Sequence, residues 1–184
     1  MMVAALAVVT SCNKSAPDPV AAAIEAAAMK DAEGEYTFRI TSLAKIDSTT
    51  FRTEIGRRRE LFALKQQVEE RHFQKYSREG KKKNAESHRL DMEKAKANLE
   101  YMDYLEQELA DTLDDIAYYD YVFSGYSKTD DSRMTYDNVY VTITPAGEVL
   151  TMTANEKDLH KGTGRAIPGY IEGITAEELE GAAI

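Results

Sequence analysis

The most regular hydrophobic pattern in the chain lies near its centre, over residues 85–116. Apolar side chains recur there at steps of three and four, at Met92, Ala95, Leu99, Met102, Leu105, Leu109, Leu113 and Ile116. This spacing predicts a helix with one apolar stripe, about 48 Å long at about 1.5 Å per residue. The stripe should face another element of the fold.

A second long helix is predicted before it. Ser48, Thr49 and Thr50 supply hydroxyls suited to an N-cap, and the helix should run to about Tyr76. Its apolar positions are Phe51, Ile55, Leu61, Phe62, Leu64, Val68 and Phe73. The link between the two helices, residues 77–84, is short and polar, so we expect them to pack antiparallel as a hairpin over residues 50–116.

Strand patterns lie on both sides of this hairpin. Residues 35–42 alternate apolar and polar side chains, and residues 118–127, 135–144 and 148–154 are rich in aromatic and β-branched residues. Pro145-Ala146-Gly147 suits a tight turn between the last two strands. The predicted fold is therefore α+β: an antiparallel sheet of about four strands, with the helical hairpin inserted between strands 1 and 2 and a β-meander over residues 118–154.

The two ends of the chain have their own signals. An Ala-rich helix is predicted over residues 20–30, and residues 155–184 are expected to form a loop followed by a short helix. Thr175-Ala176-Glu177-Glu178 matches the capping box that begins such a helix. Residues 20–184 are thus expected to form a single domain.

The first twelve residues resemble the lipobox of bacterial lipoproteins. An apolar run ends in Val9-Thr10-Ser11-Cys12, and Cys12 is the single cysteine. The run is too short to span a bilayer, which takes about 20 residues, but suits a signal peptide. The resemblance implies cleavage after residue 11, lipid on Cys12 and a tether over residues 12–19. Because no Lys or Arg precedes the run, we expect the start of the protein to lie upstream.

Charge is unevenly distributed. The chain has 23 Lys and Arg against 32 Asp and Glu, which disfavours nucleic acid as a partner. Residues 52–96 carry a net charge of +6 and residues 97–184 one of −13. The basic residues Arg78, Lys81, Lys82 and Lys83 gather at the expected hairpin tip, where they are suited to meet anionic lipid or polysaccharide or simply to be solvated.

Candidate chemistry is sparse. The three histidines do not form an H-E-x-x-H motif, and we expect no metal site and no cofactor. His72, Glu86 and His88 lie near the hairpin turn and offer one metal-ligand alternative. Asp111, Asp114, Asp115 and Asp120 form an acidic run suited to a solvated face, with a carboxylate pair for acid–base work or calcium as the alternative. Tyr121, Tyr126, Tyr136, Tyr140 and Tyr170 are the candidate binding surface, as an aromatic platform for a glycan or peptide or as ordinary sheet packing.

A second resemblance covers residues 139–174. The stretch G-T-G-R-A-I-P-G-Y, from residue 162, followed by E-G-I, is similar to a motif of FKBP-type peptidyl-prolyl isomerases. The resemblance implies an apolar pocket in which Tyr170 takes the place of the family's Trp. The family's pocket Asp and first-strand Tyr correspond to Thr151 and Ile143, and ten residues follow Ile174.

These patterns lead to one expected function and two alternatives. We expect a non-catalytic, lipid-anchored binding or interaction protein of the cell envelope, facing the periplasm or the exterior, with an envelope protein or glycan as partner. The alternatives are a degenerate FKBP-like isomerase or chaperone and a small-ligand-binding lipoprotein.

Overall fold

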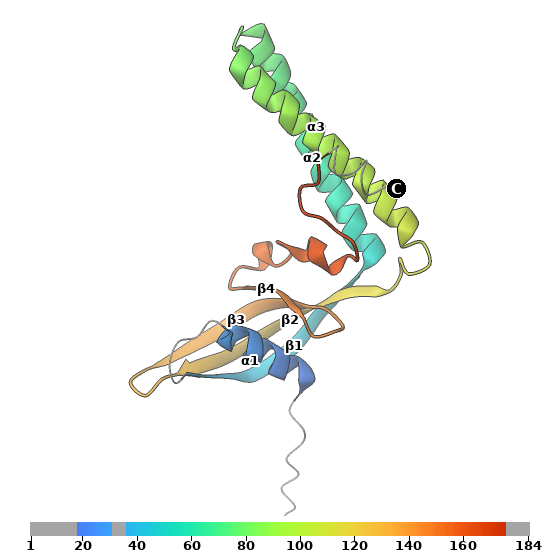
Figure 1. The fold of residues 1–184 in the computed structure, drawn as a ribbon. Coiled ribbons are helices and arrows are strands. Elements are labelled where there is room, and N and C mark those ends of the chain that lie inside the picture. The colour runs from blue at the N-terminus through green and yellow to red at the C-terminus, as the bar shows by residue number, and fades with distance from the viewer. Residues whose placement is uncertain (1–17, 31–35, 176–184) are drawn as a thin grey trace, which may run out of the picture.

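The computed structural model describes residues 18–30 and 36–175, and Figure 1 shows their arrangement. The elements are α1 (Pro19–Met29), β1 (Thr37–Thr50), α2 (Phe51–Arg78), α3 (Lys82–Glu108), β2 (Ile116–Lys128), β3 (Arg133–Ile143), β4 (Val149–Thr153) and the 3-10 helices η1 (Glu156–Asp158) and η2 (Thr163–Ala166). The expected signal peptide, Cys12, most of the tether and the helix after Thr175 lie outside the described residues.

The four strands form one antiparallel sheet in the order β1-β2-β3-β4. β1 pairs with β2 along its whole length, from Thr37 opposite Lys128 to Thr50 opposite Ile116, and the helical hairpin lies between these two strands in the chain. The predicted fold class is confirmed. The turn before β4 also has the expected chemistry, since Gly147 adopts a positive φ of 86° that a side chain would disfavour.

α1 covers one face of the sheet. Asp18 caps this helix by accepting a hydrogen bond of 2.9 Å from the amide of Val20. Ile24 is fully buried against Phe38, Phe123 and Val141 of the three neighbouring strands. Because side chains alternate along a strand, Tyr119, Tyr121 and Phe123 face α1, whereas Tyr118 and Asp120 face the other side.

The hairpin projects from one end of the sheet as a long two-helix arm (Figure 1). Thr50 caps α2 as expected, accepting from the amide of Thr53 at 3.3 Å. Beyond the base of the arm, half-buried positions recur along α2 at Phe62, Gln66, Glu69, Phe73 and Tyr76, and inward positions along α3 at Ala85, His88, Met92, Ala95, Leu99 and Met102. Steps of three and four on both helices are those of an antiparallel coiled coil.

The long second helix of the hairpin is shorter than its hydrophobic stripe predicts. α3 ends at Glu108, and residues 109–115 turn back toward the start of α2. There the carbonyls of Asp115 and Leu113 accept hydrogen bonds from the amides of Phe51 and Arg52, at 3.1 and 2.8 Å. These amides belong to the first turn of α2, where helical partners are lacking. Residues 109–115 therefore leave the helix, cap the first turn of α2 and lead into β2.

β1 is longer than expected, because its second half, residues 43–50, is a strand through its pairing with β2 and not through alternation of apolar and polar side chains. Residues 43–50 lack a clean alternating pattern, yet they pair with β2, with register shifts after Ile40, Lys45 and Thr49. Pairing with a long neighbour satisfies backbone groups whatever the side chains.

The C-terminal segment covers the other face of the sheet and the base of the hairpin. Leu159 accepts a hydrogen bond from the Thr142 hydroxyl through its carbonyl, at 3.2 Å. Further along, Ile167 and Ile174 are buried with Ile55, Met102 and other residues of the hairpin base. No helix in the described ranges is both long and apolar enough to cross a lipid bilayer.

Candidate functional site

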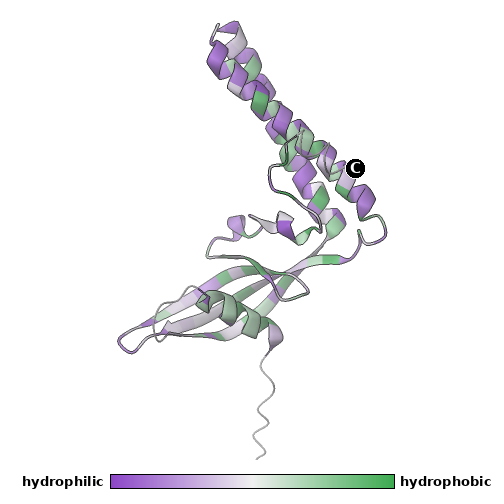
Figure 2. Ribbon diagram, viewed as in Figure 1, coloured by the Kyte–Doolittle hydropathy of each residue, from purple (hydrophilic) through white to green (hydrophobic). Residues whose placement is uncertain are grey.

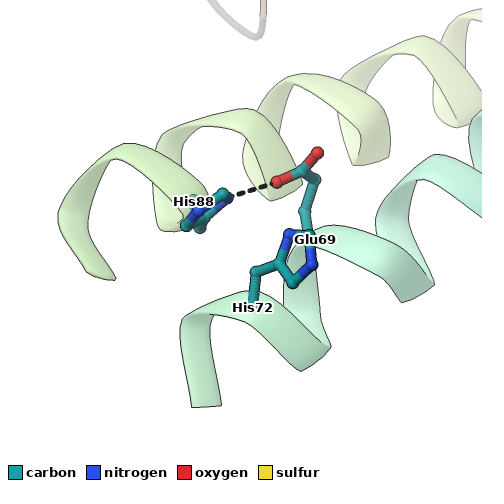
Figure 3. Close-up of side chains that lie close together, drawn as sticks. All are labelled: Glu69, His72 and His88. Atoms are coloured by element: carbon teal, nitrogen blue, oxygen red, sulfur yellow. Dashed lines mark hydrogen bonds and ion pairs between the residues drawn. The ribbon is translucent and has the colours of Figure 1, made fainter. Parts of the chain in front are cut away.

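The outer half of the hairpin holds a cluster of possible metal ligands. Glu69 and His72 lie one turn apart on α2, and His88 reaches toward them from α3 (Figure 3). One ligand atom from each of the three lies within 4.8 Å of the others. The Nδ1 of His88 is 2.6 Å from a carboxylate oxygen of Glu69. The Glu69 and His88 side chains are 16% and 24% exposed, and His72 is exposed.

This cluster differs from the metal-ligand alternative suggested by the sequence. His72 and His88 do come together, but the carboxylate beside them is Glu69 and not Glu86, which pairs with Arg89 at 2.7 Å. The signal that could have identified Glu69 is its spacing, because a Glu and a His three residues apart share one face of a helix.

Aromatic contacts hold the His88 ring in place. The ring of Tyr76 stacks on it with centroids 5.2 Å apart and 4° between the planes. The ring of His72 meets His88 edge-on at 4.9 Å. Because both neighbours come from α2, they restrict the orientation of the imidazole on α3.

The four basic residues of the predicted tip lie at or beside the turn between α2 and α3. Arg78 ends α2, Lys81 precedes α3 and is paired with Glu79 at 2.8 Å, and Lys82 and Lys83 begin α3; all four are exposed. The hydrogen bond to Lys81 lowers the pKa of Glu79. The first turn of α3 contains no acidic residue, although the helix dipole favours acids there. Basic residues in the first turn of α3 are therefore locally unfavourable for the helix. Figure 2 shows that hydrophilic residues predominate at the tip of the hairpin.

A buried carboxylate lies at the opposite, inner end of the arm. Glu54 is fully buried, and its two oxygens accept hydrogen bonds from Arg57 at 2.8 Å, Arg58 at 2.9 Å, Tyr118 at 2.7 Å and Thr163 at 2.8 Å. These donors come from α2, β2 and η2. The carboxylate therefore joins the hairpin, the sheet and the C-terminal segment. Burial, together with the Glu54 charge, raises the pKa of Tyr118 to about 12.

Tyr170 belongs to the same network. Its hydroxyl accepts from Arg58 at 2.9 Å, the Arg58 guanidinium lies 4.7 Å from its ring centre, and Tyr101 is stacked at 6.4 Å. Burial raises the pKa of Tyr170. Gly164 leaves room for this contact, since a Cβ there would be 2.3 Å from Arg58 Cζ. In the FKBP-like stretch, Tyr170 thus lies against the hairpin base.

A second buried acid lies nearby on β2. Asp120 is 2% exposed; it accepts from the Thr142 hydroxyl at 2.8 Å and contacts the Nε2 of His160 at 3.0 Å. The acidic run of the sequence is therefore divided. Asp114 is exposed and paired with Arg52 at 2.8 Å, and this hydrogen bond lowers its pKa. Asp120 is instead part of the packing between the sheet and the C-terminal segment.

The five candidate tyrosines do not share one face. Tyr121 and Tyr136 pack in the cluster beneath α1. Tyr126 and Tyr140 lie on the opposite face by strand alternation, with the Arg133 guanidinium 4.0 Å from the Tyr126 ring centre. Tyr170 is at the hairpin base. An aromatic platform made of all five is thus not assembled.

Comparison of the chain with protein-family models, with curated proteins and with solved structures finds no match. The function has to be argued from the geometry described above.

Proposed function

We propose that this protein is an exported, lipid-anchored interaction module of the cell envelope, and that its helical hairpin is the arm that contacts the partner. One observation carries the proposal: the outer half of the hairpin stands clear of the rest of the described chain (Figure 1). The bonds that join the hairpin to the body come from its inner half, through Glu54, Arg58, Asn98 and Tyr101.

The length and direction of the arm support this assignment. α2 has 28 residues, which corresponds to about 42 Å at about 1.5 Å per residue. The hairpin tip and α1 lie at opposite ends of the molecule (Figure 1). A lipid on Cys12, a few residues before α1, would therefore leave the tip pointing away from the attachment site. An element that makes few contacts with the rest of the protein but extends far from it is suited to contact a partner.

The outward face of α2 offers apolar surface for such a contact. Leu61, Leu64 and Val68 are 58%, 57% and 37% exposed and follow the three-and-four spacing of one helical stripe. Exposed apolar stripes bordered by charge are typical of protein interaction sites. The basic residues at the tip extend this surface, so an acidic, partly apolar partner fits it best.

The polar groups at the hairpin base are assigned a supporting role. Glu54 accepts four hydrogen bonds and is closed to solvent, so it has no lone pair directed at a substrate. The network connects three parts of the chain and so joins the arm to the sheet and to the C-terminal segment. A rigid base is what a projecting arm requires.

Export and anchoring are tested by fractionation. The protein, expressed in a bacterial host with residues 1–11 present, should enter the membrane fraction and incorporate labelled fatty acid. Cys12→Ser should abolish the label and release the protein from the membrane. Label retained by Cys12→Ser, or an N-terminus that includes residues before Cys12, would contradict the anchor.

The arm is tested separately by site-specific photo-crosslinking in intact cells. A photoreactive residue at Leu64 should give a discrete crosslinked product that Leu61→Lys weakens, whereas the same probe at exposed Thr135 on the sheet should not. Equal products from both sites would remove the hairpin from the interaction. A protease-coupled assay on a prolyl peptide addresses the isomerase alternative, for which we expect no turnover, because Arg58 already covers the ring of Tyr170.

A further inference from the structure

The distal coiled coil contains a polar layer at a position that usually holds apolar side chains. Glu69 and His88 occupy inward positions between Phe62 and Phe73 on one helix and between Ala85 and Met92 on the other. Burying polar groups in such a seam costs stability, which a ligand can offset. His72 completes the layer from the solvent side (Figure 3).

We propose that Glu69, His72 and His88 bind one Zn²⁺ ion between the two helices of the arm. Two imidazoles and one carboxylate are a ligand set that zinc uses in proteins, with a fourth position taken by water or another ligand. The proposal does not depend on what the arm contacts, nor on whether Cys12 is lipidated.

The distances suit a small rearrangement on binding. Zinc bonds to nitrogen and oxygen of roughly 2.0–2.2 Å place tetrahedral ligand atoms about 3.3 Å apart. Here one ligand atom from each residue lies within 4.8 Å of the other two, and His88 Nδ1 is 2.6 Å from a carboxylate oxygen of Glu69. Changes of side-chain rotamer would open this hydrogen bond and bring the His72 nitrogen closer to the other two ligand atoms.

The surroundings favour an ordered site that remains accessible. Stacking on Tyr76 fixes the plane of the His88 ring, and the E-x-x-H spacing fixes Glu69 and His72 on one helical face. Arg89 is engaged by Glu86 at 2.7 Å and by Glu93. His72 is exposed, so the open coordination position faces solvent. A bound ion would crosslink α2 to α3 in the outer arm and stiffen the part of the hairpin that lies beyond its contacts with the rest of the described chain.

The site is tested by titrating Zn²⁺ into the full chain in a calorimeter at neutral pH. Cys12→Ser is used throughout, because it removes the single thiol as a competing ligand. We expect one equivalent to bind. His72→Ala, His88→Ala and Glu69→Gln should each weaken binding by at least about tenfold. His160→Gln and Glu86→Gln are the matched controls, a histidine and a nearby acid outside the site, and should bind as the parent does.

Two further readouts separate loss of a ligand from loss of the fold. The far-ultraviolet circular dichroism of His72→Ala should equal that of the parent, since this side chain is exposed. Co²⁺ loaded in place of zinc should give the intense visible bands of a four-coordinate ion, and these should disappear in His72→Ala. Full-strength binding by folded His72→Ala or His88→Ala, or equal weakening in the two controls, would overturn the proposal.

Discussion

Replacing Glu54 by Ala should destabilise the protein more than removal of any exposed charge on the hairpin. The carboxylate is fully buried at the point where α2, β2 and η2 meet. Ala leaves Arg58, Tyr118 and Thr163 without their common acceptor. All three are buried, so water does not readily replace the lost hydrogen bonds.

The expected magnitude follows from these partners. Removing one member of a buried ion pair costs about 3–5 kcal/mol, because the remaining charge stays desolvated. The Thr163 hydroxyl retains the His160 carbonyl as an acceptor at 2.9 Å, and the penalty of about 1–3 kcal/mol for the Tyr118 hydroxyl belongs to the same site and overlaps with that figure instead of adding to it. Arg57 is partly exposed and keeps its hydration. We expect a total loss of about 3–5 kcal/mol, which lowers the midpoint of thermal unfolding by at least about 6 °C for a chain of this size.

The assay is urea denaturation followed by circular dichroism, with the free energy of unfolding extrapolated to zero denaturant. Glu60→Ala is the matched control, an exposed glutamate on the same helix, and should change stability by less than about 0.5 kcal/mol. Glu54→Gln keeps the volume and one acceptor and should fall between the two. A loss below about 1 kcal/mol for Glu54→Ala would refute the reasoning, because it would mean that the carboxylate is hydrated.

Three further predictions test other parts of the fold. The pKa of Tyr118, raised to about 12 by burial and by Glu54, means that the folded state holds a proton which the unfolded state loses above about pH 10. The stabilisation from the Tyr118 proton is thus fully present below about pH 10 and is lost by about pH 12. Between these pH values the free energy of unfolding of the parent, measured by urea denaturation, should fall by about 2–3 kcal/mol relative to that of Tyr118→Phe. Met102→Ala, at a fully buried position, should cost about 2–5 kcal/mol, whereas exposed Leu64→Ala should cost less than about 0.5 kcal/mol; equal effects would mean that the two faces of the hairpin are assigned wrongly. Gly164→Ala places a methyl group 2.3 Å from Arg58 Cζ, so it should destabilise by about 1–3 kcal/mol and lower the thermal midpoint, and an unchanged midpoint would show that the segment shifts freely.

Much of the hairpin could be predicted because its signals are local. The step of three and four from Met92 to Leu105 forces these residues onto one side of any helix. In the structure Met102 and Leu105 are indeed buried, and Thr50 caps α2. The alternation of apolar and polar side chains around Phe38 likewise predicts a strand, whichever strands lie beside it in the sheet. Local periodicity determined which elements exist and, through the order of the elements, the α+β class.

The candidate sites were less predictable, because they join residues from different elements. Glu54 carries no local signal of its burial, because its partners Tyr118 and Thr163 lie more than sixty positions away in the chain. Spacing along one helix relates Glu69 to His72, but the pairing of Glu69 with His88 depends on the register of two antiparallel helices. The lipid on Cys12 stays a prediction from the sequence pattern alone.

The sequence by itself determined the helices, the strands and their order, because backbone periodicity and capping act over a few residues. Only the tertiary structure decided that α3 ends at Glu108, although its apolar stripe continues to Ile116. It also decided that Phe62 and Phe73 lie inward on α2 while Leu61 and Leu64 lie outward. The physical reason is the same in both cases: hydrophobicity favours burial, but which side chains are buried depends on what packs against them and on which backbone groups still need a partner.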